Sequence, residues 1–341
     1  MSRRMPLALV LLIVSAVVWY LSRGNLGDRP YLVVYCAHDA VFADEILREF
    51  ERQSGIRVIA KYDSEATKSL GFVNLLVQEK DVPQCDVFWN NELLGMCELQ
   101  EQGVLTAYRG SGYARIPDQF RDPEGFWVGF AARLRVFIVN TEKMNADLAE
   151  IEARLQDDAD LTRVAIAQPL FGTTLTQYTL WHHVWGADRL RDWHADVRRR
   201  GLREVKGNSA TKDLVADGAC DFAFTDNDDY FVARDAGRPV AMLPVRIDGR
   251  TCCIPNSVAI IRGTPRSDLA QQLVDYLLSA ETELRLARSE SRQIPLGPIN
   301  AGDLPDDVRP LVAWAADGAD LRPLLSDRRA VIAWLKSEYL K

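Results

Sequence analysis

The feature that most constrains this chain is the repeated alternation of short apolar runs with longer amphipathic segments. Runs at 31–36, 56–60 and 85–89 have the length of buried strands, and helical periodicity follows each of them. Strands that are apolar on both faces belong to sheets that are covered on both sides. The order β-α-β-α-β-α therefore predicts an α/β fold with a parallel sheet and right-handed crossovers.

The second half of the chain resumes this alternation after long extended runs. We expect the runs at 126–130 and 134–139 to lead into a second lobe, and the run at 253–261 to return from it. A length of 341 residues suits two compact lobes. The predicted organisation is a signal-anchor and spacer at 1–30, lobe 1 at 31–133, lobe 2 at 134–250, and the return segment with C-terminal helices of lobe 1 at 251–341.

The N-terminus has the pattern of an export signal. Arg3 and Arg4 precede an apolar stretch at 6–21, and a polar spacer follows it. An A-x-A-like cleavage site is not found after this stretch, nor is a cysteine that could accept lipid. We therefore predict an uncleaved signal-anchor, with cleavage as the second choice. Either alternative places Gly24 onward on the periplasmic side of the cytoplasmic membrane.

Charge and cysteine content narrow the function classes. The net charge is −7 and no basic block offsets it, which argues against nucleic acid as a partner. Six cysteines in an exported chain could form disulfides, but their spacing fits no zinc signature. A bridge between Cys36 and Cys85 and simple burial as small apolar residues both remain open.

An acidic cluster follows a predicted buried strand at 220–224. Asp226, Asp228 and Asp229 lie within four residues of one another, together with Asn227 and Tyr230. Ligands of open α/β sheets bind beyond the carboxyl ends of the strands, where this cluster is expected. Carboxylates that lie this close repel one another unless a cation, a donor group or water separates them. A solvated turn is the alternative interpretation.

Other polar motifs also follow predicted strands or open predicted helices, at 37–39, 90–91, 172–174 and 208–209. Glycine and threonines that open a helix leave backbone N–H groups and hydroxyls pointing at one spot. Two lobes joined by two extended crossings form a hinged clamp that binds its ligand between them. We expect all of these motifs to face that one cleft.

Several of these motifs, in this order, make the chain resemble the ferric-iron-type substrate-binding proteins of ABC transporters. The similarity extends from Tyr31 to about Pro298 and rests on the segments 34–39, 86–91, 131–136, 207–209 and 291–295. The resemblance implies a two-lobe type II periplasmic-binding-protein architecture with two extended hinge crossings. It also implies delivery of a solute to a membrane permease, and no catalysis.

The iron ligands of that family do not carry over unchanged. The family commonly uses a pair of adjacent tyrosines, and this pair aligns with Asp228 and Asp229, with Tyr230 just beyond. The family's loop histidine aligns with Asp39, beside His38. A tyrosine that some members carry before Arg133 is an alanine here. The chain thus presents carboxylates where phenolates are expected.

Two kinds of ligand follow from these residues. Carboxylate oxygens suit a hard cation such as Fe(III), Mn(II) or Ca(II), and the predicted metal ligands are Asp39, Asp228, Asp229 and Tyr230. The alternative is an oxyanion or an aminophosphonate, held at helix N-termini by hydroxyls and an arginine. The predicted ligand contacts are His38, Asp39, Asn90, Asn91, Arg133, Thr173, Thr174, Asn208, Ser209, Asp226, Asp228, Asp229 and Tyr230.

The sequence therefore predicts a monomeric extracytoplasmic solute-binding protein of an ABC importer, which closes on a transported, iron-like cation or metal chelate and needs no catalytic cofactor. An exported metal-assisted hydrolase is the alternative from another class. The chain lacks a G-x-S-x-G elbow and an H-E-x-x-H helix, which argues against it. A sensory role stays open, because binding and sensing share such folds.

Overall fold

The computed structural model describes residues 29–63, 70–156 and 158–339. Most of the predicted signal-anchor and spacer, residues 1–28, lies outside these described residues. Among the described residues, no helix combines the length and the apolar character that crossing a membrane requires.

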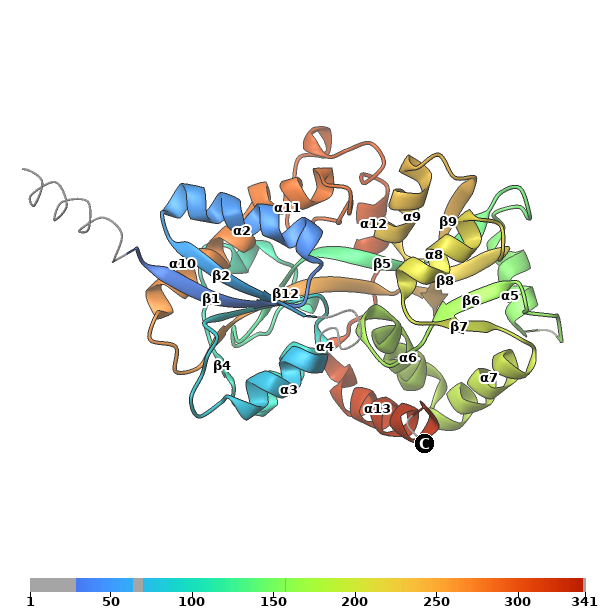
Figure 1. The fold of residues 1–341 in the computed structure, drawn as a ribbon, viewed down its shortest axis with the longest axis horizontal. Helices are drawn as coiled ribbons and strands as arrows, with labels where there is room; N and C mark the ends of the chain where they lie inside the picture. The colour runs from blue at the N-terminus through green and yellow to red at the C-terminus, as the bar shows by residue number, and fades with distance from the viewer. Residues whose placement is uncertain (1–28, 64–69, 157, 340–341) are drawn as a thin grey trace, which may run out of the picture.

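The first part of the chain forms the expected alternation of strands and helices (Figure 1). Strand β1 pairs in parallel with β2 on one side and with β3 on the other. Helix α2 buries an apolar face and is capped by the residue that follows it, Gly55, which adopts the left-handed conformation at φ 74°. The elements are β1 (Tyr31–Cys36), α2 (Ala40–Ser54), β2 (Arg57–Tyr62), α3 (Leu70–Gln78), β3 (Val87–Asn90), α4 (Leu94–Glu101) and β4 (Leu105–Thr106).

Two long antiparallel strands connect the halves of the molecule. The two extended runs predicted at 126–130 and 134–139 are one continuous strand, β5 (Val128–Asn140), in which Ala131 has a φ of 42°. Strand β12 (Cys253–Ile261) pairs with β5, and its register shifts between Pro255 and Asn256. The sheet order β2-β1-β3-β12-β5-β8-β6-β7 places these two strands at the centre.

The second part carries its own parallel strands, with β6 between β7 and β8. Strand β8 begins and ends two residues later than predicted, so that Asp226 is its last residue. The residues after it are the first turn of a helix and not a loop. The elements are α5 (Leu148–Gln156), β6 (Val164–Ala167), α6 (Gly172–Trp185), α7 (Ala187–Arg199), β7 (Arg203–Val205), α8 (Asn208–Ala216), β8 (Phe222–Asp226), α9 (Asn227–Asp235) and β9 (Val240–Pro244).

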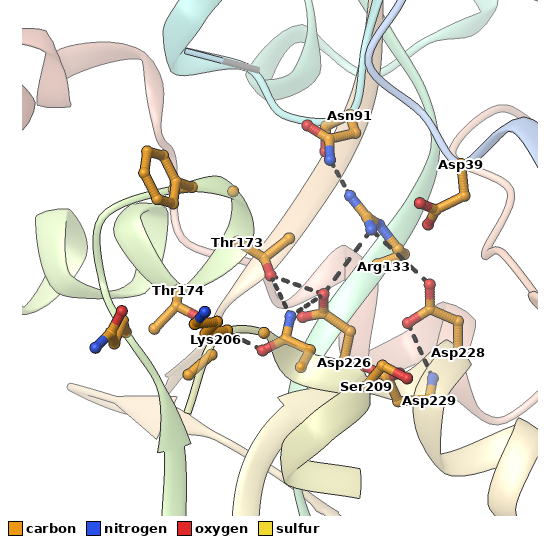
Figure 2. Close-up of a pocket in the computed structure, with 16 residues that line it drawn as sticks. Asp39, Asn91, Arg133, Thr173, Thr174, Lys206, Ser209, Asp226, Asp228 and Asp229 are labelled. Atoms are coloured by element: carbon orange, nitrogen blue, oxygen red, sulfur yellow. Dashed lines mark hydrogen bonds and ion pairs between the residues drawn. The ribbon is translucent and has the colours of Figure 1, made fainter. Parts of the chain in front are cut away.

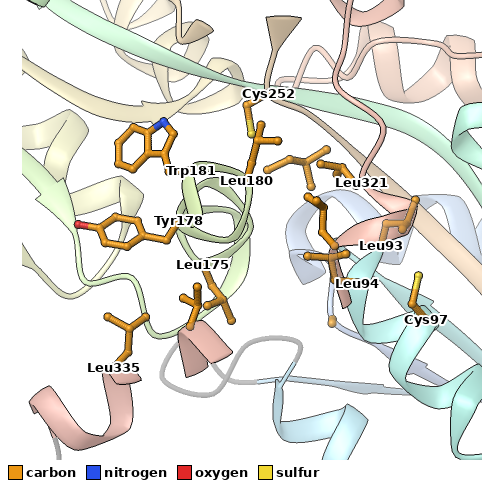
Figure 3. Close-up of a cluster of buried hydrophobic side chains, with 14 of the residues drawn as sticks. Leu93, Leu94, Cys97, Leu175, Tyr178, Leu180, Trp181, Cys252, Leu321 and Leu335 are labelled. Atoms are coloured by element: carbon orange, nitrogen blue, oxygen red, sulfur yellow. The ribbon is translucent and has the colours of Figure 1, made fainter. Parts of the chain in front are cut away.

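The return segment ends in helices that contact both halves. Leucines of α4, α6 and the C-terminal segment belong to one apolar cluster, of which Figure 3 shows a part. On α13, Asp327 pairs with His182 of α6 at 2.6 Å, and Arg329 pairs with Glu98 of α4 at 2.9 Å. The remaining elements are β10 (Arg246–Ile247), β11 (Arg250–Thr251), α10 (Ser267–Leu277), α11 (Ala280–Arg288), α12 (Leu311–Ala316) and α13 (Leu325–Tyr339).

All six cysteines are buried, and none of them forms a disulfide bond. A bridge between Cys36 and Cys85 is therefore not formed, and the alternative that the sequence left open, burial as small apolar residues, describes these side chains. Burial also raises the pKa of the Cys85 thiol well above its usual range. These cysteines serve the packing of the core.

His194 on α7 is a buried histidine that is held neutral. Its Nδ1 lies 3.1 Å from the Tyr178 hydroxyl, and its Nε2 lies 3.4 Å from the Tyr339 hydroxyl. Burial, with a smaller contribution from the charge of Arg198, lowers the pKa of His194 to about 4. The unfolded chain therefore binds a proton at this position at higher pH than the folded protein does.

We expect His194 to weaken the fold as the pH falls from about 6.5 to about 4. In this window the unfolded chain binds more protons, so the free energy of unfolding decreases with falling pH, by up to about 3 kcal/mol. The variant His194→Gln should show a shallower dependence of the free energy of unfolding on pH, measured by urea denaturation between pH 4 and 7. Equal slopes for the two proteins would contradict the prediction.

Candidate functional site

A cavity of about 120 Å³ lies where the strand ends and helix starts of the two halves meet (Figure 2). The structure brings together ten of the thirteen residues that the sequence singles out. These lining residues are Asp39, Asn91, Arg133, Thr173, Thr174, Asn208, Ser209, Asp226, Asp228 and Asp229.

Three of the singled-out residues lie outside the cavity lining. His38 is buried against the Trp89 ring and lies 2.7 Å from the Gln293 amide. Asn90 donates to Glu92 and is buried, because it and Asn91 alternate in direction at the end of β3. Tyr230 packs against the Phe231 ring, on a different side of α9 from Asp228. In this geometry the three side chains support the site and do not face a ligand.

Sequence reasoning missed four side chains that line the cavity, Ala167, Gln168, Phe171 and Lys206. Gln168 directly follows β6, and Lys206 lies just before the start of α8. The rule that identified the other motifs, polar residues at strand ends and helix starts, would have found both. Ala167 and Phe171 are apolar and give no such signal in the sequence.

The acidic cluster occupies the junction of β8 and α9. Asp226 ends the strand, while Asp228 and Asp229 lie in the first helical turn. Oxygens from these three carboxylates lie within 4.8 Å of one another. The Thr225 hydroxyl donates to Asp229 at 2.7 Å. A strand that passes directly into a helix thus concentrates three negative charges, and the positive end of the helix dipole reduces their repulsion only in part.

Asp226 is held by a complete set of partners. Nη1 of Arg135 donates to its Oδ1 at 2.8 Å. Its Oδ2 accepts from the Thr173 hydroxyl at 2.7 Å and from the Asn208 amide at 2.9 Å. Arg135 is fully buried on β5, and its Nε also donates to Gln177 at 2.6 Å. The ion pair between Arg135 and Asp226 therefore holds this part of the cavity wall in place.

The negative charges of Asp228 and Asp229 are compensated much less than that of Asp226. Burial raises the pKa of Asp228 well above its usual range, and the positive charge of Arg133 reverses this only in part. Burial likewise raises the pKa of Asp229 to about 6, although the bond from Thr225 opposes the shift. Asp39, from the other half of the molecule, adds to the negative field on Asp228. The cavity therefore favours positive charge near these two carboxyls.

The part of the cavity wall that adjoins Asp226 is formed by two helix starts. Helix α6 begins at Gly172, whose φ is 55°, and the next two residues are Thr173 and Thr174. Helix α8 begins at Asn208, directly after Gly207, and Lys206 lies beside it. The first backbone N–H groups of a helix lack partners within that helix and attract negative groups. One cavity thus combines an acidic wall with a wall suited to anions.

Comparison with known proteins relates the chain to a described protein family. The family model described as bacterial extracellular solute-binding protein matches residues 45–308. A similar curated protein is iron uptake protein A2 of Synechocystis sp., which is 24% identical over 270 residues and is matched over 73% of each chain.

Two solved structures share the fold. Iron-bound HitA from Pseudomonas aeruginosa superposes with a TM-score of 0.76 at 20% identity, covering 89% of this chain and 99% of that one. AfuA from Actinobacillus pleuropneumoniae, with fructose-6-phosphate bound, superposes with a TM-score of 0.71 at 20% identity, covering 91% and 99%. The two-lobe binding-protein architecture predicted from the sequence is confirmed by these likenesses.

Proposed function

Because this chain belongs to the bacterial extracellular solute-binding proteins, we propose that it captures a multiply charged hard cation, iron-like in charge, and delivers it to an ABC permease. The observation that carries the proposal is the cluster of Asp226, Asp228 and Asp229, whose oxygens lie within 4.8 Å of one another. Carboxylate oxygens are the ligands that hard cations prefer.

The electrostatics of the cavity support this proposal. The raised pKa values of Asp228 and Asp229 mean that their charged forms are disfavoured in the protein without solute. A bound cation would relieve the repulsion among the charged carboxylates. This relief would contribute to the free energy of cation binding. Asp39 lies on the other half, so a cation held between Asp39 and Asp228 would draw the two lobes together.

The names of similar proteins point the same way. The Synechocystis sp. relative is named an iron uptake protein, and the HitA structure is described as iron-bound. In this chain, we propose that carboxylates from α9 and from the start of α2 take the place of phenolate ligands. The cation is the transported solute and not a catalytic cofactor, and we propose no enzymatic activity.

An oxyanion, such as a phosphate ester or an aminophosphonate, is the second candidate solute. The starts of α6 and α8, with Lys206 and the hydroxyls of Thr173 and Thr174, favour it. AfuA, which shares the fold, is described with fructose-6-phosphate bound. The negative charge of Asp228 and Asp229, which their neighbours compensate only in part, weighs against an anion and leads us to prefer the cation.

We further propose where and how the protein acts. Residues 31–133 and 251–341 would form lobe 1 and residues 134–250 lobe 2, with closure about β5 and β12. The apolar N-terminal stretch at 6–21 would tether the protein to the periplasmic side of the cytoplasmic membrane. It would act there as a monomer beside its permease.

A panel of solutes tests the proposed function. We expect Fe(III) supplied as citrate, or Mn²⁺, to raise the thermal stability of the purified protein, by about 2.7 kcal/mol at a hundredfold excess over Kd. Citrate alone, phosphate, fructose-6-phosphate and aminoethylphosphonate should cause no shift. Metal analysis of protein purified without chelators should find bound metal. If a phosphate compound stabilised the protein and no metal did, the solute would be an anion and the cation proposal would be wrong.

A further inference from the structure

The cavity already contains a positive charge of its own, Arg133. Its side chain is only 4% exposed, and Nη1 lies 3.8 Å from Oδ2 of Asp226 and 3.8 Å from Oδ2 of Asp228. Nη2 donates to the backbone oxygen of Asn91 at 2.6 Å. Figure 2 shows the guanidinium between the loop that carries Asn91 and the acidic cluster. It therefore occupies the space in which a bound cation would meet these carboxylates.

Arg133 is held loosely compared with Arg135, which lies two residues away on the same strand and points to the same side. Arg135 donates hydrogen bonds to Asp226, Gln177, Thr173 and Asn208. The contacts of Arg133 with the carboxylates are too long for hydrogen bonds. Its Nε has no hydrogen-bond partner among the described residues. These contacts give the Arg133 side chain electrostatic attraction to the carboxylates and one hydrogen bond to the backbone of Asn91.

The field of the acidic cluster stabilises the positive charge of this buried arginine. Burial lowers the pKa of Arg133, but Asp228, Asp226, Asp39 and Asp229 together outweigh burial and raise it. A guanidinium in such a field acts as a counter-ion. A second cation at the same oxygens would meet its repulsion, because like charges this close oppose each other strongly.

We propose that Arg133 is an internal counter-ion that holds the cation site when no solute is bound and that an incoming cation must displace. This inference rests on the proposed function and refines it. A monovalent ion would exchange one positive charge for another and would gain nothing. A divalent or trivalent ion gains charge at the carboxylates, so Arg133 selects solutes by their charge. The role of Arg133 is thus opposite to the anion contact that the sequence suggests for this residue.

The bond to Asn91 extends this role to the position of the lobes. Asn91 follows β3 in the first part of the chain, whereas Asp226 and Asp228 belong to the second. Arg133 therefore links the two sides of the cavity through its own side chain. When a cation takes over the carboxylates, the guanidinium releases the second lobe, and the cation itself becomes the link.

Removal of the charge tests the proposal. Arg133→Gln, with Arg133→Met as a second uncharged variant in case the first folds poorly, should bind Mn²⁺ at least about tenfold more tightly than the unaltered protein by isothermal titration calorimetry. Arg133→Lys, which restores a positive charge, should bind Mn²⁺ more weakly than Arg133→Gln. Arg163→Gln removes an equal charge at the Asp221 pair, outside the cavity lining, and should leave the affinity unchanged.

The outcomes separate this inference from the proposed function. Tighter Mn²⁺ binding by the uncharged variants supports the inference, because damage to the fold would weaken binding. If the unaltered protein binds Mn²⁺ and both uncharged variants bind it equally well or less well, the counter-ion role is wrong while the cation function stands. If phosphate binds in place of Mn²⁺ and Arg133→Gln abolishes phosphate binding, both are wrong.

Discussion

The double variant Asp228→Asn/Asp229→Asn should lose at least about 100-fold of the affinity for Mn²⁺, which corresponds to about 2.7 kcal/mol. Both carboxylates belong to the cluster whose oxygens lie within 4.8 Å of one another. Asparagine keeps the shape of each side chain but removes the charge that attracts the cation. Isothermal titration calorimetry of the two proteins measures the loss.

The same variant should be more stable than the unaltered protein when no solute is present. The raised pKa values of Asp228 and Asp229 show that the fold disfavours their charged forms at neutral pH. Neutral side chains remove this penalty, so urea denaturation should give a larger free energy of unfolding. Gain of stability with loss of binding is the pattern expected of residues that are retained for function.

The pH dependence of Mn²⁺ binding provides a further test of the same carboxylates. Protons compete with a cation for Asp229, whose pKa is raised to about 6. The affinity of the unaltered protein for Mn²⁺ should therefore fall as the pH is lowered through about 6, and an affinity for an anion should rise.

A matched control removes two charges elsewhere. Asp188 and Asp192 are exposed on α7, and Asp188→Asn/Asp192→Asn should bind Mn²⁺ as the unaltered protein does. Equal Mn²⁺ affinity in the cavity variant and this control would count against the assigned cation site.

The variant Asp226→Ala should lower the free energy of unfolding by about 3–5 kcal/mol, because it leaves a buried positive charge without its partner. Arg135 is fully buried and its Nη1 lies 2.8 Å from Asp226. Asp226 also accepts hydrogen bonds from Thr173 and Asn208, which would lose their acceptor. Urea denaturation with a two-state fit measures the loss.

Two further variants test whether the unpaired charge of Arg135 causes this loss of stability. Asp226→Ala/Arg135→Met removes both charges and should recover part of the lost stability, since no buried charge is then left alone. Asp158→Ala breaks an ion pair with Arg199 in which both side chains are largely exposed, and should cost less than about 1 kcal/mol. If Asp226→Ala cost no more than Asp158→Ala, the pair would not anchor the cavity.

Much of the fold was predictable because its signals are local. Apolar runs of strand length, followed by helical periodicity, indicated the strands from β1 to β3 and their parallel pairing. Boundaries were less accurate at β8. The apolar run ends at Phe224, yet the strand continues to Asp226, because pairing with β5 supplies hydrogen-bond partners as far as Arg135.

The candidate site was predictable to the extent that topology alone brings residues together. Strand ends and helix starts meet at one edge of such a sheet, and Asp39, Asn91 and Asp228 were singled out for that reason. The directions of side chains were harder to predict. Asn90 and Tyr230 differ by a single position from residues that face the cavity. The hydrogen bond from Asn90 to Glu92 and the packing of Tyr230 against Phe231 turn them away.

The sequence by itself determined the α/β class, the two-lobe organisation and the concentration of carboxylates after one strand, because periodicity and spacing along the chain encode these properties. Only the tertiary structure decided that Arg135 is anchored while Arg133 is loosely held. The two arginines are alike in sequence, and their partners, Asp226, Gln177 and Asn91, are distant along the chain. Their difference is therefore a matter of distances that folding alone sets.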